Sequence, residues 1–191
     1  MTIIDELLPA ALATTKYIPF YIWDDRILIE STSSASVDVV IGLLAKCIDP
    51  FPVEQLHLNQ SPAGSMTTWL VEDEAPAGFT IDNEVEMKST SESRASVRWL
   101  NQTVDAKAAR EHTQQGKQCV RMAMTWSDKW SFVVTDQFVL KKIKANDIFD
   151  ENLQEPEAQD IDGNLAIYGK SVYDLIDALI GAHGGLKAEA A

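Results

Sequence analysis

The sequence has few cysteines and histidines, and the few that it has form no recognisable site. Cys47 and Cys119 lie far apart and match no metal-binding or redox spacing, so we expect both to be reduced, buried thiols. The histidines His57, His112 and His183 are scattered along the chain, which does not favour a zinc site. No cofactor or metal is predicted.

Long apolar runs are also missing. No stretch approaches the ~20 apolar residues that a membrane-spanning helix needs, and the start of the chain lacks the basic and apolar regions of a signal peptide. No phosphate-binding glycine loop, dinucleotide fingerprint or Ser/His/Asp arrangement is present. These absences predict a cytoplasmic protein with no membrane partner, and 191 residues suffice for one domain or two small ones.

Basic residues are outnumbered but concentrated in the middle of the chain. The net charge of −13 argues at first against a nucleic-acid partner. Between Lys88 and Lys144, however, 11 basic residues face five acidic ones, so this segment carries +6 and the remainder −19. Such asymmetry is expected where one surface binds phosphates and the rest repels non-specific contacts. The alternative is that these charges only solvate a set of strands and one helix.

The order of predicted elements indicates an α+β fold with mostly antiparallel sheets and packed helices. Hydrophobic periodicity and turn signals predict helices over 2–13, 33–47, 65–71, 105–115 and 171–182, and strands over 18–23, 27–30, 53–58, 79–88, 96–102, 118–126, 130–135, 139–144 and 165–168. In the strand over 118–126, alternation predicts Val120, Met122, Met124 and Trp126 on one face and Cys119, Arg121 and Thr125 on the other. We expect an N-terminal α/β part over 1–64 and a C-terminal part over 65–191.

One triplet has a catalytic spacing. Glu86-Met87-Lys88, with Asp73 or Asp82 upstream, matches the Asp…Glu-x-Lys pattern of metal-dependent nucleases, in which carboxylates hold a divalent metal. The pattern is short and acidic residues are abundant, so a chance match is the simpler interpretation. On a strand Glu86 and Lys88 point to the same face, where they can pair as surface charges. We therefore expect no catalytic residues and no enzyme.

Blocks of residues along the whole chain follow a recognisable order and approximate spacing from about Ile4 to Gly185. These blocks are Leu7-Leu8-Pro9, Trp23-Asp24, Ile27-Leu28-Ile29, Thr68-Trp69-Leu70, Gly78-Phe79, Asp82, Glu86-Met87-Lys88, Gly116-Lys117, Met122-Ala123-Met124-Thr125-Trp126, Phe132-Val133, Lys141-Lys142-Ile143-Lys144, Gly169, Leu175–Ile180 and Gly184-Gly185. Together they resemble the RdgC family of bacterial recombination-associated proteins. The resemblance implies a homodimer that closes as a ring around duplex DNA, binds with little sequence preference, limits access of the RecA recombinase and needs no cofactor. A ring with a basic lining and an acidic exterior would also account for the net charge.

The sequence departs from the family's pattern in three ways. It begins about a third of the way into a usual member, which puts a complete ring in doubt. The family's Leu-Leu-Pro-Arg-Ala-Phe ring contact is matched by Leu7-Leu8-Pro9-Ala10-Ala11-Leu12, so that Leu12 replaces an aromatic tip. The basic Lys-Lys-Gln stretch that lines the family's DNA channel is matched by Leu100-Asn101-Gln102, which keeps only Gln102. Such a shortened form suits a phage or mobile-element protein.

These observations predict a sequence-independent, nucleoid-associated DNA-binding protein that modulates homologous recombination by occupying duplex, or also single-stranded, DNA. The residues expected to contact DNA are Arg94, Arg98, Gln102, Lys107, Arg110, Lys117, Arg121, Lys141, Lys142 and Lys144. The residues expected at a dimer contact are Leu12, Leu175 and Leu179, although the apolar side of the last helix can equally belong to the chain's own core. Two alternatives stay open: an acidic decoy that binds a recombinase or defence protein, and a metal-dependent exonuclease.

Overall fold

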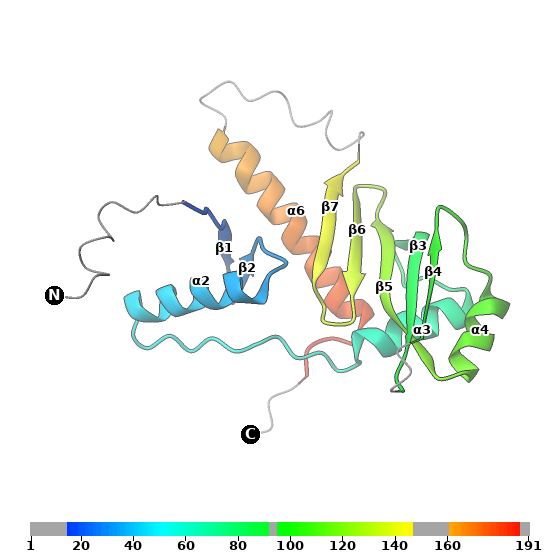
Figure 1. Ribbon diagram of the computed structural model, residues 1–191. Coiled ribbons are helices and arrows are strands. Elements are labelled where there is room, and N and C mark those ends of the chain that lie inside the picture. Colours follow the sequence, from blue (N-terminus) through cyan, green and yellow to red (C-terminus); the bar gives the residue numbers. More distant parts are fainter. Residues whose placement is uncertain (1–14, 92–94, 147–160, 188–191) are drawn as a thin grey trace. The chain divides into compact units, whose positions relative to one another are not determined.

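The computed structural model describes residues 15–91, 95–146 and 161–187, with side chains described from residue 167 onward in the last helix (Figure 1). These residues form four helices and two antiparallel sheets, which confirms the α+β class. The chain divides into two compact units, Met1–Pro52 and Val53–Ala191. The division expected at residues 64 and 65 stays a prediction, and the helix predicted over 2–13 lies outside the described residues. Across the described ranges, no helix is long and apolar enough to cross a membrane.

The first unit contains a β-hairpin and a helix. Strands β1 (Phe20–Trp23) and β2 (Arg26–Ile29) pair antiparallel, and Asp24 in the turn between them has a φ of 48°, a left-handed conformation that Asp tolerates better than most residues. Helix α2 (Ser34–Cys47) begins after Ser33, as the sequence predicts. Cys47 at its end is exposed, so the expectation that both thiols are buried is wrong for this residue, which lies where the helix ends rather than on its packed side.

The second unit is built on a five-stranded antiparallel sheet with the strand order β4-β3-β5-β6-β7. Its strands are β3 (Phe79–Ser89), β4 (Ser96–Leu100), β5 (Lys117–Trp126), β6 (Trp130–Thr135) and β7 (Leu140–Ala145). Tight turns join β5 to β6 and β6 to β7. The described strands of this unit all lie between Phe79 and Ala145, a range that contains the basic segment 88–144. The basic middle of the sequence is therefore mostly sheet.

Three helices complete this unit (Figure 1): α3 (Pro62–Glu72), α4 (Ala106–Gln114) and α6 (Ile161–Ala182). Side-chain caps fix the starts of the first two. Ser61 Oγ accepts a hydrogen bond from the backbone N–H of Gly64 at 3.2 Å, and Asp105 Oδ1 accepts one from Lys107 at 3.2 Å. Each cap satisfies a donor that would otherwise lack a partner in the first helical turn.

One continuous core joins the three helices to one face of the sheet. Met66 of α3, Ala109 of α4 and Leu179 of α6 are fully buried in the same cluster as the sheet residues Met122 and Val134. A hydrogen bond also ties α6 to β6, because the indole Nε1 of Trp130 donates to Ser171 Oγ at 2.8 Å. Since all three helices pack on this face, the other face of the sheet has none of the described helices of this unit on it.

Two predicted strands are not found. Of residues 53–58, only Leu58 forms a β-bridge, to Leu186. Residues 165–168, predicted as a strand, belong to α6, which begins at Ile161 rather than at Ser171. A short apolar run does not distinguish a strand from a buried helical segment. Tyr168, in this segment, packs edge-to-face on Trp130 at 5.1 Å between ring centroids. Such tertiary contact, rather than the local preference of residues 165–168, favours the helix over the strand.

The expected alternation of β5 holds for most of the strand and fails at one end. Met122, Met124 and Trp126 face the helices, and Arg121 and Thr125 face away, as predicted. Cys119 was expected beside Arg121 but is fully buried in the core. The pairing of β3 with β5 shifts register between Glu86 and Met87, which is typical of a β-bulge, and the shift reverses the alternation beyond that point.

Candidate nucleic-acid interface

Cationic side chains gather on the face of the five-stranded sheet that points away from the helices, which we call the outer face. Paired residues in a sheet share a face and successive residues alternate, so the buried residues Val85 and Met87 fix their neighbours on β3 as outward-pointing. The cationic residues of the outer face are Lys88, Arg98, Arg121, Lys141, Lys142 and Lys144, and its acidic residues are Asp82, Glu84 and Glu86. The outer face is therefore net positive although the chain is strongly acidic.

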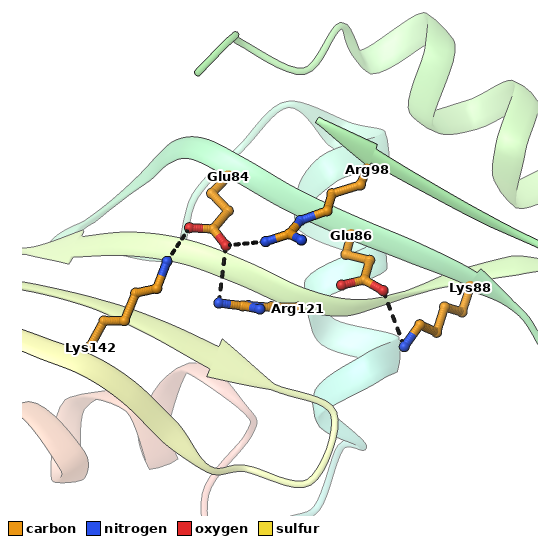
Figure 2. A network of polar contacts seen from close by, with 6 residues as sticks. All are labelled: Glu84, Glu86, Lys88, Arg98, Arg121 and Lys142. Atoms are coloured by element: carbon orange, nitrogen blue, oxygen red, sulfur yellow. Dashed lines mark hydrogen bonds and ion pairs between the residues drawn. The ribbon is translucent and has the colours of Figure 1, made fainter. Parts of the chain in front are cut away.

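A carboxylate lies at the centre of three of these cations (Figure 2). Glu84 Oε1 is 3.0 Å from Arg98 Nη2 and 3.0 Å from Arg121 Nη2, and Glu84 Oε2 is 2.9 Å from Lys142 Nζ. The three cations come from three strands, β4, β5 and β7, whereas Glu84 comes from β3. The cluster carries two more positive charges than negative ones.

Irregular stretches in two strands, β3 and β7, bring Glu84 and Lys142 into contact. Between the pairs Ile81–Met124 and Val85–Met122, β3 has more residues than β5, which places Glu84 in an irregular stretch. In β7 a second shift of register includes Lys142, whose φ is 53°. Bulges turn side chains away from the regular alternation. Here they allow Lys142 to reach past two strands to Glu84, above the small buried residues Ala123 and Val133 that pair in the middle of the sheet.

The surrounding cations keep Glu84 ionised. The hydrogen bond from Lys142 lowers the pKa of Glu84 below its usual value of 4.5, partial burial opposes this, and Arg98 and Arg121 lower the pKa further. The side chain of Glu84 is 18% exposed and that of Arg121 is 23% exposed. Arg121 Nε is buried and has no hydrogen-bond partner within the described part of the chain. The arginine therefore has donor capacity that Glu84 does not use.

The remaining cations of the outer face are more loosely held. Lys88 Nζ lies 3.1 Å from Glu86 Oε1, and 53% of the Lys88 side chain is exposed. Lys144 pairs with Ser131 and Lys141 pairs with Val133 across the β6–β7 ladder. Neither of these two lysines has an acidic partner among the described residues. They present free positive charge at one side of the Glu84 cluster.

The structure separates the residues predicted to contact DNA into two groups. Arg98, Arg121, Lys141, Lys142 and Lys144 lie together on the outer face. The others lie elsewhere: Gln102 follows the end of β4, Lys107 and Arg110 are on α4, Lys117 is at the start of β5, and Arg94 lies outside the described residues.

Two cations of the second group have contacts that hold them to the helical side. The guanidinium of Arg110 donates from Nε to the carbonyl oxygen of Val71 in α3 at 2.8 Å. Lys117 Nζ lies 3.2 Å from His112 Nδ1 and donates to Gln115 Oε1 at 2.6 Å, both at the end of α4. These contacts stabilise the packing of α4, so the outer face is the better candidate for binding a polyanion.

One charged residue of the outer face, Glu84, was singled out by no prediction, whereas Lys88 was considered only as part of the nuclease-like triplet. Glu84 belongs to the alternating series of β3 that includes Glu86 and Lys88, so period-two alternation was the signal that could have placed it there. The convergence of three cations on Glu84 has no such signal. It depends on pairing between strands and on bulges, neither of which one sequence specifies.

The carboxylates of the nuclease-like pattern do not gather into a metal site. Asp82 Oδ2 accepts a hydrogen bond from Thr125 Oγ1 at 2.9 Å, Glu86 pairs with Lys88, and Asp73 occupies the left-handed C-cap of α3. Within residues 15–91, 95–146 and 161–187, no three His, Cys, Asp or Glu side chains are grouped so as to hold a metal ion.

Of the residues expected at a dimer contact, Leu175 and Leu179 have no exposed surface and belong to the core of the second unit. This placement favours the alternative that the apolar side of α6 completes the chain's own core. Leu12 lies outside the described residues. A homodimer contact through these residues stays a prediction.

The fold and this site define an α+β protein whose main sheet has one face packed against helices and one cationic face. Comparison with known proteins is more specific. Residues 2–186 match the family model described as "Putative exonuclease, RdgC". The chain is 40% identical over 190 residues to the recombination-associated protein RdgC of Bordetella parapertussis, covering 96% of this chain and 63% of that protein. It is 36% identical over 192 residues to the protein of the same name from Herminiimonas arsenicoxydans, covering 97% and 63%.

The chain therefore belongs to the RdgC family, as its sequence blocks indicated. It spans about 63% of the length of these relatives. The relatives are named for an association with recombination, whereas the family model is described by an exonuclease activity.

Proposed function

We propose that this chain binds DNA on the outer face with little sequence preference and thereby modulates homologous recombination. The observation that carries the proposal is the position of five predicted DNA contacts, Arg98, Arg121, Lys141, Lys142 and Lys144, on the one face of the sheet that the helices of the second unit do not cover. Affinity for a nucleic-acid backbone comes mainly from cations that neutralise phosphates, and it needs no base contacts. The names of the relatives support a role in recombination.

The end of β4 adds support from the family resemblance. Leu100, which matches a position expected to line the DNA channel of the family, pairs with Glu84 at the edge of the outer face. Gln102 follows it and is exposed. Leu100, the first residue of the stretch that the resemblance assigns to DNA, therefore lies beside Glu84 on the outer face, and Gln102 lies two residues beyond the end of this strand.

We further propose that the bound chain limits access of RecA to DNA, that it acts as a homodimer, and that it works in the cytoplasm at the nucleoid. Duplex DNA is the expected ligand, and single-stranded DNA is the second substrate to test. We propose no cofactor.

An acidic decoy remains the competing function, because 24 acidic residues lie outside the basic segment 88–144.

The test compares two variants that remove the same charge from different places. Lys141→Gln with Lys144→Gln removes two positive charges from the outer face, whereas Lys107→Gln with Lys129→Gln removes two from exposed positions on α4 and in the β5–β6 turn. Each phosphate contact contributes about 0.9 to the slope of log affinity against log salt. We expect the outer-face variant to flatten this slope by up to about 1.8 for duplex DNA, and the control variant to leave it nearly unchanged.

Two outcomes would contradict the proposal. Equal effects of the two variants would mean that DNA is not bound at the outer face. No binding of the wild-type chain to any DNA at low salt would favour the decoy, which predicts instead a direct complex with a recombinase or defence protein.

A further inference from the structure

We propose that Glu84 is an internal counter-ion that competes with backbone phosphates for Arg98, Arg121 and Lys142, and so limits the affinity of the outer face for DNA. The inference rests on the proposed function. It adds that a carboxylate of the chain itself forms ion pairs with these cations when no nucleic acid is bound.

The geometry shows the competition. Each oxygen of Glu84 accepts from at least one cation at 2.9 to 3.0 Å, the distances at which Arg and Lys also hold a phosphate oxygen. A carboxylate and a phosphate both offer these donors a negatively charged oxygen as acceptor. A phosphate that approaches the face must therefore either displace Glu84 or share its partners.

The cluster is held loosely enough for exchange. The side chains of Arg98 and Lys142 are 44% and 63% exposed, so their ion pairs with Glu84 lie in water and contribute little to stability. Arg121 is more buried, and it holds Glu84 through Nη2 at 3.0 Å while its buried Nε has no partner among the described residues. The two exposed cations can turn to a phosphate while Arg121 keeps Glu84 in place.

The negative charge of Glu84 opposes the binding of DNA phosphates to the outer face. The carboxylate is ionised, and it lies within one Debye length (~10 Å at 0.1 M salt) of a phosphate that binds these cations where they now lie. It repels that phosphate and screens three of the six cations of the outer face. Lys141 and Lys144, which lack acidic partners among the described residues, are then the contacts available first.

The main experiment measures duplex DNA binding of Glu84→Gln across a series of salt concentrations. Gln keeps the shape of the side chain and one acceptor but removes the charge. We expect about fivefold tighter binding at low salt, the size of removing one repulsion a few ångströms from a phosphate in water. We also expect a salt slope steeper by about 0.9 for each cation that gains a phosphate.

Two variants with the same change of charge serve as controls. Glu111→Gln alters an exposed position on α4, away from the outer face, and should leave affinity and slope nearly unchanged. Glu86→Gln releases only Lys88 and should have an effect between the other two. An equal gain for all three variants would show a general charge effect and would overturn the role of Glu84.

A double-variant cycle excludes a merely structural role. Lys142→Gln should weaken DNA binding little in the wild-type background, where Glu84 holds the lysine, and more in the Glu84→Gln background. Binding by Glu84→Gln that is unchanged or weaker would overturn the inference, since Glu84 would then organise the cations rather than withhold them. Failure of the proposed function looks different, because the Lys141 and Lys144 variant would then bind DNA as the wild type does.

Discussion

The ammonium of Lys88 lies 3.1 Å from the carboxylate of Glu86, two residues earlier on the same face of β3. In a metal-dependent nuclease these residue types would serve the metal and the attacking water. Here each is the other's partner, and the nearby carboxylate of Asp82 accepts from Thr125. The pair thus has a structural explanation.

This pairing predicts that the chain does not cleave DNA. We expect no loss of linear duplex or single-stranded DNA in the presence of magnesium or manganese, measured on a gel against time. Glu86→Ala and Lys88→Ala, purified identically, are the controls for contaminating nuclease. Cleavage by the wild type that both variants lose would support the exonuclease named in the description of the family model.

The role of Leu179 can be tested by placing a charge in the core. Leu179 has no exposed surface, so Leu179→Asp should remove the cooperative thermal unfolding transition, at a cost of more than about 4 kcal/mol. Ile167→Asp is the matched control, because Ile167 lies on the same helix and is 55% exposed. Circular dichroism against temperature is the measurement. A folded, monomeric Leu179→Asp variant of a dimeric wild type would instead show that this residue makes the dimer contact.

Most of the sheet could be predicted because the alternation of buried and exposed residues can be recognised within each short segment of sequence. Met122 and Met124 alternate with Arg121 and Thr125, and this pattern alone placed a cationic side chain on the outer face. Local pattern failed at Cys119, where a shift in pairing with β3 reversed the alternation. It failed again at residues 165–168, which extend α6.

The candidate site could be predicted only in part. The basic segment contains all six cations of the outer face, and five of them were predicted to contact DNA, but it also includes Lys107, Arg110 and Lys117, which lie on α4 or contact it. The Glu84–Lys142 contact joins residues that are 58 positions apart. Its existence depends on irregular stretches in two strands, and a single sequence gives no measure of where such irregularities occur.

A buried histidine gives the second unit a defined dependence on pH. The imidazole of His183 has no exposed surface and lies edge-to-face with Trp69 and Phe138, at 5.1 and 5.3 Å between ring centroids. Its Nδ1 is 2.7 Å from the carbonyl oxygen of Leu179, which can only accept, so Nδ1 carries the proton. Nε2 is buried and has no partner among the described residues. Burial lowers the pKa of His183 below 6.5 and keeps the ring neutral, an effect that the hydrogen bond to Leu179 opposes.

We therefore expect stability to fall as the pH drops below about 6.5, because the unfolded chain then binds a proton that the folded chain excludes. The loss should approach about 1.4 kcal/mol per pH unit between the two pKa values and disappear above pH 7. Urea unfolding at pH values from about 7.5 to 5.5 measures the slope. His183→Leu should reduce the slope even if it lowers the overall stability, whereas His57→Gln, at an exposed position, should not. An identical slope in wild type and His183→Leu would assign the pH dependence to other groups.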